Sequence, residues 1–391
     1  MAAPIRVLVT DDSVVLRRLI TDVLSGDPDI EVVGTAVNGK NALDKLPTLK
    51  PDIMTLDIEM PIMDGLQTLV EVRKLNRKLP IIMFSTLTER GAGATLDALE
   101  RGASDYVTKP ANVGSIKESM DAVRSQLIPK IKSLTGRAPI APARTRPAFG
   151  GAPPPPGGNR LAVPGAGARP GVSSAPAPAG TSARPTGRVD VVAIGVSTGG
   201  PDALTQVVSN LPGGFPVPIV VTQHMPPVFT QLFAQRLDGK ARLRVVEARN
   251  GEMLEPGKIL IAPGDYHMRL VKKSGGVGVA LDQGPQENYC RPAVDPMFRS
   301  VPECYGGNAL AVIMTGMGHD GYRGAEHILH AGGSLIVQDE ATSVVWGMPG
   351  AAVHAGLPCE ILPLGKIADA ITARVNARAG GATGNMRGAR A

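Results

Sequence analysis

The chain alternates short apolar runs with amphipathic stretches over most of its 391 residues. Runs such as 5–10, 52–56, 189–195, 218–223 and 309–314 have the length and continuity of strands that are buried on both faces. The stretches between them have the apolar spacing of helices that pack on a sheet. This alternation predicts α/β architecture in which doubly wound sheets are mainly parallel.

One long segment breaks the pattern. Residues 130–187 are rich in Pro, Gly and Ala, and they contain almost no large apolar side chains that could offset the entropy cost of ordering. We therefore predict two folded domains, at 1–128 and 188–376, joined by a flexible, basic linker at 129–187. Residues 377–391 are predicted to be a disordered tail.

The positive charge of the chain is concentrated in these same segments. Nine Lys or Arg and no acid lie between Lys130 and Arg188, and four more Arg follow Asp369. The folded parts are therefore acidic, and no helix-turn-helix or basic aromatic platform is visible, so nucleic acid is not an expected partner. Three cysteines without a C-x-x-C spacing predict neither a disulfide framework nor a zinc site. With no apolar run of about 18 residues, we expect a cytoplasmic protein without membrane insertion.

Carboxylates follow two strands of the first predicted domain. Asp11 and Asp12 come directly after the run 5–10, and Asp57 follows the run 52–56. Parallel strands place their carboxyl ends along one edge of a sheet, where these acids would repel one another unless a divalent cation bound among them. Oxygen ligands of this kind suit Mg²⁺.

Two further strands would add a hydroxyl and an ammonium group to the same edge. The run 81–84 ends at Ser85, and the run 104–107 is followed by Thr108 and Lys109. A carboxylate nucleophile, a metal, a hydroxyl and a lysine are what transfer of a phosphoryl group onto Asp57 requires. The alternative is that each Asp caps a helix or begins a turn.

The order of these residues resembles the receiver domains of response regulators over residues 5 to about 126, and so implies a flavodoxin-like fold. The resemblance implies that Asp57 accepts the phosphoryl group and that Asp11, Asp12, Asp57 and the carbonyl of Glu59 hold Mg²⁺. It assigns phosphoryl sensing to Ser85 and Lys109, with Tyr106 as the aromatic switch residue. It also implies a cis bond between Lys109 and Pro110.

The second domain presents a serine on a tight turn. The run 189–195 ends in Gly195-Val-Ser-Thr-Gly-Gly200, which places Ser197 between a strand and a helix. Such glycines could cradle a phosphate, or the serine could be a nucleophile, since G-x-S-x-G matches the nucleophile elbow. The spacing is not G-x-G-x-x-G, and the next strand ends in His224 where a dinucleotide site would place an acid. These features favour the nucleophile.

A third strand, 309–314, leads to Asp320, which could hold the His224 imidazole in its correct tautomer. Two other histidines compete as the base. His319 adjoins Asp320, so its side chain would diverge from that carboxylate, and His267 is a further rival. The chain order Ser, His, Asp disfavours ordinary α/β-hydrolases, in which the acid precedes the histidine.

Five motifs of this domain resemble the chemotaxis protein-glutamate methylesterases: 194–200, 222–227, 261–265, 291–295 and 315–321. The resemblance implies a Rossmann-like domain in which Ser197 is the nucleophile, His224 the base and Asp320 its orienter. It places oxyanion donors at the N–H of Met317 and near Thr198.

By the same resemblance the substrates are methyl-accepting chemoreceptors, and a sensor histidine kinase supplies the phosphoryl group. The esterase would need no cofactor, the receiver would need Mg²⁺, and a monomer is expected. The alternatives are a receiver-controlled binding or scaffold module without catalysis and a nucleotide-binding output domain.

Overall fold

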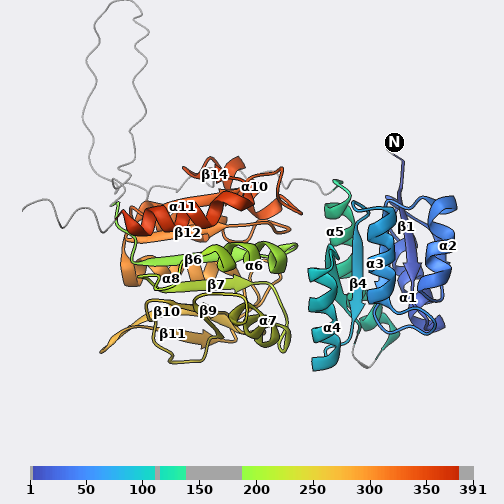
Figure 1. Cartoon of the computed structure of the whole chain (residues 1–391), viewed down its shortest axis with the longest axis horizontal. Helices are drawn as coiled ribbons and strands as arrows, with labels where there is room; N and C mark the ends of the chain where they lie inside the picture. The colour runs from blue at the N-terminus through green and yellow to red at the C-terminus, as the bar shows by residue number, and fades with distance from the viewer. Residues whose placement is uncertain (1–2, 111–114, 138–186, 378–391) are drawn as a thin grey trace, which may run out of the picture.

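The computed structural model describes residues 3–110, 115–137 and 187–377. They form two α/β domains that pack side by side (Figure 1). Most of the predicted linker and tail lies outside these residues, so its predicted flexibility stays a prediction.

The first domain contains a five-stranded parallel sheet in the order β2-β1-β3-β4-β5. Its helices α1 and α5 cover one face of the sheet and α2, α3 and α4 the other. The sheet and helices are β1 (Ile5–Thr10), α1 (Val14–Ser25), β2 (Ile30–Ala36), α2 (Gly39–Leu49), β3 (Ile53–Asp57), α3 (Gly65–Leu75), β4 (Ile81–Ser85), α4 (Glu89–Glu100), β5 (Asp105–Thr108) and α5 (Ile116–Leu134).

Helix α5 continues to Leu134, into the range 129–187 that its composition assigned to the linker. Pro129 lies inside this helix, and its apolar neighbours Leu127 and Ile131 are buried against the sheet. Packing of one helix face therefore extends the domain beyond the predicted boundary. The predicted cis bond between Lys109 and Pro110 is wrong, because the cis peptide bond among the described residues joins Arg291 and Pro292.

The second domain contains a seven-stranded parallel sheet in the order β14-β13-β12-β6-β7-β9-β8, with a separate antiparallel hairpin β10-β11. Helices α6, α7 and α11 cover one face, and α8, α9, α10 and the hairpin cover the other. The elements are β6 (Val191–Val196), α6 (Gly200–Asn210), β7 (Ile219–Gln223), α7 (Phe229–Asp238), β8 (Arg244–Glu247), β9 (Lys258–Ile261), β10 (His267–Lys273), β11 (Gly276–Asp282), α8 (Val294–Tyr305), β12 (Ala309–Ile313), α9 (Tyr322–His330), β13 (Ser334–Gln338), α10 (Gly347–His354), β14 (Glu360–Leu362) and α11 (Leu364–Asn376).

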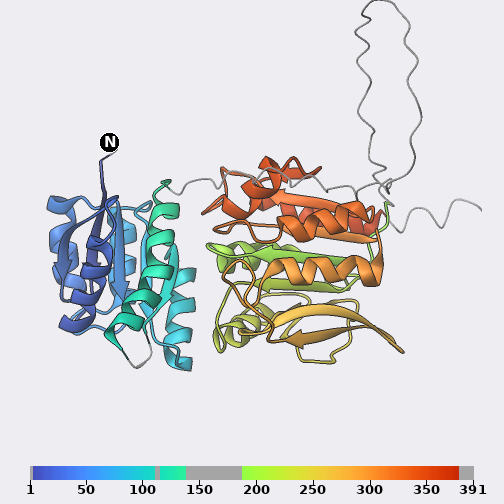
Figure 2. The same cartoon turned by 180° about the vertical axis from the view of Figure 1, so that it is seen from behind.

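The two domains meet where α4 of the first packs against α6 and α7 of the second, and the view from behind shows the same arrangement (Figure 2). One apolar cluster is continuous across this boundary and includes Leu96 and Tyr106 on one side and Phe229 and Phe233 on the other. The Tyr106 and Phe229 rings stack, with centroids 4.9 Å apart. At the rim, the Arg236 side chain contacts Asp97 at 2.6 Å.

Candidate functional site

The three strands that precede Ser197, His224 and Asp320 are neighbours in the sheet, in the order β12-β6-β7. Their carboxyl ends therefore share one edge, which the assignment of His224 as the base requires. The Ser197 Oγ lies 3.0 Å from His224 Nδ1, and His224 Nε2 lies 2.8 Å from Asp320 Oδ2. The histidine thus presents Nδ1 to the serine and carries its proton on Nε2 when neutral.

Backbone packing fixes the turn that carries Ser197. Its N–H donates to the Thr315 carbonyl, and the Thr315 hydroxyl donates to the Thr198 carbonyl at 2.9 Å. Gly199 has a φ of +74°, which favours glycine. At Gly316 a Cβ atom would lie only 2.8 Å from Ser197 Cβ, so the chain can approach the serine only because Gly316 has no side chain.

Two backbone N–H groups beside Ser197 are available to a ligand. Among the hydrogen bonds found in the described residues, none has the N–H of Thr198 or of Met317 as its donor. The close approach of Gly316 to Ser197 brings the Met317 peptide near the serine. This arrangement is consistent with the predicted oxyanion donors.

The rival histidines make other contacts. His267 is buried, its Nε2 donates to the Pro285 carbonyl at 2.9 Å, and its Nδ1 accepts from the Ala293 N–H. Both of its nitrogens are therefore used within the fold. The ring of His319 packs near that of Tyr322, with centroids 6.0 Å apart.

The charge around His224 favours the imidazolium form. Burial works against a charged ring, but the adjacent Cys290 and then Asp320 act in the opposite direction, Asp320 through its hydrogen bond and negative charge. The net effect raises the pKa of His224. Asp320 is buried, yet its contacts with His224 and with two backbone N–H groups hold its pKa below the usual value.

Three residues of this site were not predicted from the sequence to act in it. Cys290 lies beside His224, the Asn288 amide donates to Asp320 Oδ1 at 2.8 Å, and the same amide contacts Asp295. Asp295 is the last residue of the motif 291–295, and Cys290 directly precedes that motif. The motif was the one signal in the sequence that this segment belongs at the site. These residues escaped prediction because they precede or begin α8 and do not follow one of the strands that carry the triad.

In the first domain the predicted acids also come together. One ligand atom from each of Asp11, Asp12 and Asp57 lies within 4.8 Å of the others. Asp11 Oδ2 and Asp57 Oδ2 are buried and have no hydrogen-bond partner. Unpartnered carboxylate oxygens of this kind fit a Mg²⁺ ion.

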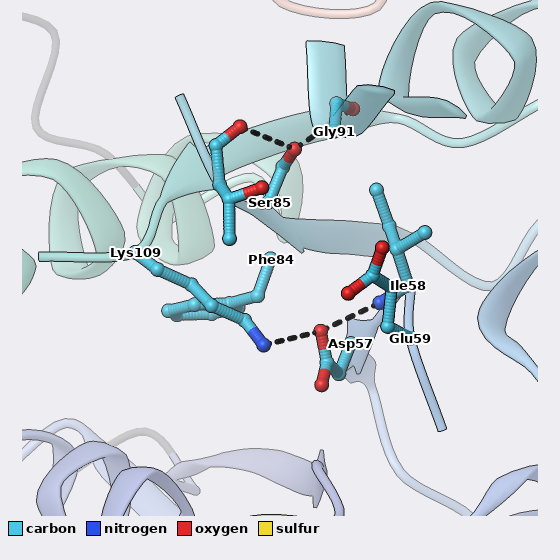
Figure 3. Close-up of a pocket in the computed structure, with 8 residues that line it drawn as sticks. Asp57, Ile58, Glu59, Phe84, Ser85, Gly91 and Lys109 are labelled. Carbon is cyan, nitrogen blue, oxygen red and sulfur yellow. Dashed lines mark hydrogen bonds and ion pairs between the residues drawn. The ribbon is translucent and has the colours of Figure 1, made fainter. Parts of the chain in front are cut away.

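Three more of the predicted residues, Glu59, Ser85 and Lys109, line the pocket around Asp57 (Figure 3), whereas Tyr106 does not. Lys109 Nζ lies 2.6 Å from Asp57 Oδ1. The Ser85 hydroxyl does not contact Asp57 but donates to the Gly91 carbonyl of α4 at 3.0 Å. Glu59 lies at the mouth with an exposed side chain, which leaves its carbonyl as the expected ligand.

Burial sets the proton affinity of these acids. It raises the pKa of Asp11 to about 6, and the nearby Asp57 charge adds to the effect while Lys109 opposes it. The pKa of Asp57 is raised for the same first reason, against the hydrogen bond and charge of Lys109. In the absence of a cation the two carboxylates are therefore held in an unfavourable charged state.

A side chain of the receiver domain forms a hydrogen bond with Thr198, the residue next to Ser197. The Thr198 hydroxyl donates to Asp105 Oδ2 at 2.7 Å, and both side chains are buried. Asp105 is also held by Lys130, whose Nζ lies 2.9 Å from its Oδ1. Tyr106, the next residue, is the ring that stacks on Phe229.

The fold and these two sites are those of a hydrolase domain with a hydrogen-bonded Ser-His-Asp arrangement, attached to a receiver domain with a cluster of acids. Comparison with known families agrees. Residues 192–371 match the CheB methylesterase family, and residues 7–121 match the response regulator receiver domain.

The chain belongs to the protein-glutamate methylesterase family, whose members are carboxylic ester hydrolases. It is 50% identical over 380 residues to a protein-glutamate methylesterase/protein-glutamine glutaminase of Nocardioides sp., with 95% of each chain covered. It is 45% identical to the protein of that name from Trichodesmium erythraeum, covering 95% of this chain and 99% of the relative. The solved catalytic domain of Thermotoga maritima CheB is 44% identical, with a TM-score of 0.47, and the match covers 47% of this chain and 98% of that one.

Among the described residues, no helix is both long and apolar enough to cross a membrane.

Proposed function

We propose that the second domain hydrolyses glutamate methyl esters on chemoreceptors and that phosphorylation of Asp57 activates it. The observation that carries this proposal is the continuous line from Ser197 Oγ through the His224 ring to Asp320, with contacts of 3.0 and 2.8 Å. This geometry is that of a serine activated by a histidine base and an orienting acid.

The reaction proceeds in two steps. His224 Nδ1 takes the proton of Ser197 as its Oγ attacks the ester carbonyl, and the backbone N–H groups of Thr198 and Met317 stabilise the oxyanion. The imidazolium returns the proton to the leaving methoxide, and methanol departs. Water then attacks the acyl-enzyme by the same route and releases the glutamate and Ser197. A glutamine amide follows the same path with ammonia as leaving group, in keeping with the glutaminase activity named for the relatives.

In the receiver, Asp57 takes a phosphoryl group from a sensor histidine kinase. Asp11, Asp12, Asp57 and the Glu59 carbonyl would hold Mg²⁺, which supplies positive charge opposite the phosphoryl oxygens. Lys109 already forms an ion pair with Asp57. Ser85, in contrast, must break its hydrogen bond to the Gly91 carbonyl to reach a phosphoryl oxygen. That movement would disturb α4, which packs on the esterase domain.

We further propose that the unphosphorylated receiver restrains the esterase. Asp105 holds the hydroxyl of Thr198, the residue next to the nucleophile, and Tyr106 packs on Phe229. Release of these contacts would need only a few kcal/mol of differential stability between the two arrangements.

The proposal is tested by methanol release from methylated receptor membranes, with and without a small phosphodonor. We expect the donor to stimulate release by the intact chain and Ser197→Ala to abolish it while the protein stays folded. His319→Ala serves as the matched control and should keep most of the activity. Turnover by Ser197→Ala within about tenfold of the intact chain would assign the nucleophile elsewhere.

A further inference from the structure

Behind the triad lies a second buried carboxylate, that of Asp295, at the start of α8. Its Oδ1 accepts from the N–H groups of Gly321 at 3.1 Å and Gly324 at 2.7 Å. These donors belong to the first turn of α9, directly after Asp320. The Asp295 side chain therefore ties down the turn that carries the triad acid.

The Asn288 side chain joins the two acids. Its Nδ2 lies 2.8 Å from Asp320 Oδ1 and 3.1 Å from Asp295 Oδ2, so the two hydrogens of one amide serve both carboxylates. The opposite amide orientation would place a carbonyl oxygen against two negative groups. The chemistry of the partners therefore fixes which way the amide points.

With this amide in place, the Asp320 carboxylate accepts four hydrogen bonds from the described residues. Oδ2 receives the His224 Nε2 and the Val294 N–H at 2.6 Å, and Oδ1 receives the Asp295 N–H at 3.0 Å and the Asn288 amide. The backbone donors come from the start of α8, where a negative charge is favoured. The amide is the single side-chain donor that also reaches Asp295.

We infer that Asn288 and Asp295 are positioning residues of the esterase. The Asn288 amide bridges the Asp320 and Asp295 carboxylates, limits their repulsion, and so holds Asp320 in the position and charge state that orient His224. Asp295 acts one step further away, by fixing the turn that begins α9 and by adding a second negative charge behind Asp320. This inference rests on the proposed role of the triad.

The charges that face the pair set the direction of each effect. His224 faces Asp320 and Cys290, and Asp295 faces Asp320 and the Arg299 guanidinium. Arg299 is itself paired with Glu287 at 2.6 Å, and Arg323 contributes a weaker charge near Asp295. Burial and the Asp320 charge raise the pKa of Asp295 to about 6, as expected for two acids that share a site.

Removal of the amide should make the His224 imidazolium more stable. Asp320 then loses a competing hydrogen-bond donor, so its negative charge interacts more strongly with His224. Removal of the Asp295 charge should make the imidazolium less stable, because one nearby negative charge disappears. The two substitutions are therefore expected to shift the titration of His224 in opposite directions. A role of Asn288 confined to packing would leave the His224 midpoint unchanged when the uncharged amide is removed.

The experiment is an NMR titration of ¹⁵N-imidazole signals in the full-length chain, with the His224 signal identified by its loss in His224→Gln. Asn288→Gly removes the amide without adding charge, at a residue whose φ is +52°, where glycine adds no strain. Asn288→Asp keeps the side-chain shape but replaces both N–H donors with a third negative charge, so Asn288→Gly is the deciding variant. We expect the midpoint to rise by about one pH unit in Asn288→Asp and by less in Asn288→Gly. It should fall in Asp295→Asn.

Gln283→Glu is the matched control, because the Gln283 amide also donates to a carboxylate, Asp265 Oδ2, at 3.0 Å but on the surface. It should leave the His224 midpoint unchanged. In methanol-release assays of the phosphorylated chain, the Asn288 variants should lose about 10- to 100-fold in kcat with little change in KM. The acid limb of kcat should move with the NMR midpoint.

An unchanged His224 midpoint in Asn288→Gly, with the fold intact by circular dichroism, would overturn the inference. Should Asp295→Asn fail to fold, Asn288→Gly still decides the question, because Asn288 lies in a partly exposed loop. A chain of native sequence that releases no methanol would instead count against the proposed function, which separates the two failures.

Discussion

The two domains each gather buried carboxylates at the carboxyl edge of a parallel sheet, but they treat them in opposite ways. In the receiver, Asp11 and Asp57 each keep a buried oxygen that accepts no hydrogen bond. In the esterase, both oxygens of Asp320 are fully supplied with donors. The receiver site is thus built to be completed by a ligand, whereas the esterase site is already complete and needs only access to its substrate.

The largest expected effect comes from breaking the complete site. Both oxygens of Asp320 accept two hydrogen bonds, so Asp320→Asn places an NH2 group against donors whichever way the amide points. Where the NH2 group faces the imidazole, His224 should take the wrong tautomer. We expect kcat for ester hydrolysis to fall by about 10⁴-fold and the unfolding free energy to fall by about 1–3 kcal/mol. Methanol release and chemical denaturation measure the two effects.

The matched control for that substitution is Asp265→Asn, which removes a half-exposed acid from an ion pair with Arg291 in the same domain. It should change kcat by less than about threefold. Equal losses in the two variants would mean that Asp320 has no special relation to His224.

The next effect tests the incomplete site. Asp57→Asn should prevent incorporation of phosphate from a small phosphodonor in the presence of Mg²⁺, and stimulation of the esterase should be lost with it. Asp52→Asn is the control, because this acid lies at the opposite end of the same strand, where it accepts from the Arg6 N–H at 2.9 Å. Phosphate retained on Asp57→Asn would relocate the acceptor.

If the esterase site is already complete, removal of the receiver domain that packs beside it should be enough to activate the enzyme. We expect deletion of residues 1–128 to raise basal hydrolysis by about tenfold, because a receiver tethered on the same chain occupies its docking surface at high effective concentration. The phosphodonor should no longer stimulate the truncated enzyme. Basal activity at or below that of the unphosphorylated full chain would contradict the restraint.

A smaller change at the same boundary should give a smaller effect. Arg236→Ala removes contacts with Asp97 at 2.6 Å and with the Gly93 carbonyl at 2.8 Å, both across the domain interface. Basal hydrolysis should rise about two- to fivefold, in line with loss of partly exposed ion pairs. Arg374→Ala, which breaks a pair with Glu360 inside the esterase domain, should leave the basal rate unchanged.

The smallest effect is on stability, and its sign separates the two acid clusters. Without Mg²⁺, Asp11→Asn should raise the unfolding free energy of the receiver by about 1–3 kcal/mol, the opposite direction to Asp320→Asn. The pKa of Asp11 is raised to about 6 in the folded state, so its charged form disfavours folding above that pH. The penalty is relieved as the pH falls through about 6 towards the unfolded value near 3.8, and the substitution should gain less there. Chemical denaturation in the presence of a chelator, above pH 6 and again near pH 4, measures this difference in stability.

Strand ends explain why so much of both sites could be predicted from the sequence. Asp57, Ser197 and His224 each follow a buried apolar run, and parallel pairing brings such positions together whatever the length of the chain between them. The amide of Asn288 could not be found in this way, because it belongs to a loop whose position depends on how α8 packs. The contact of Thr198 with Asp105 depends on the docking of two separate folds, about which periodicity within each fold carries no information.

The contact between Thr198 and Asp105 also has a consequence in the reverse direction. If the docked receiver and an engaged receptor compete for the edge beside Ser197, then each must weaken the binding of the other by the same factor, since coupling free energies between binding events are reciprocal. A receptor segment bound at Ser197 would therefore shift the population towards undocked receivers, in which α4 no longer bears on the esterase. The amount of receptor substrate would then change how readily Asp57 is phosphorylated. The esterase domain would in this way influence the receiver that controls it.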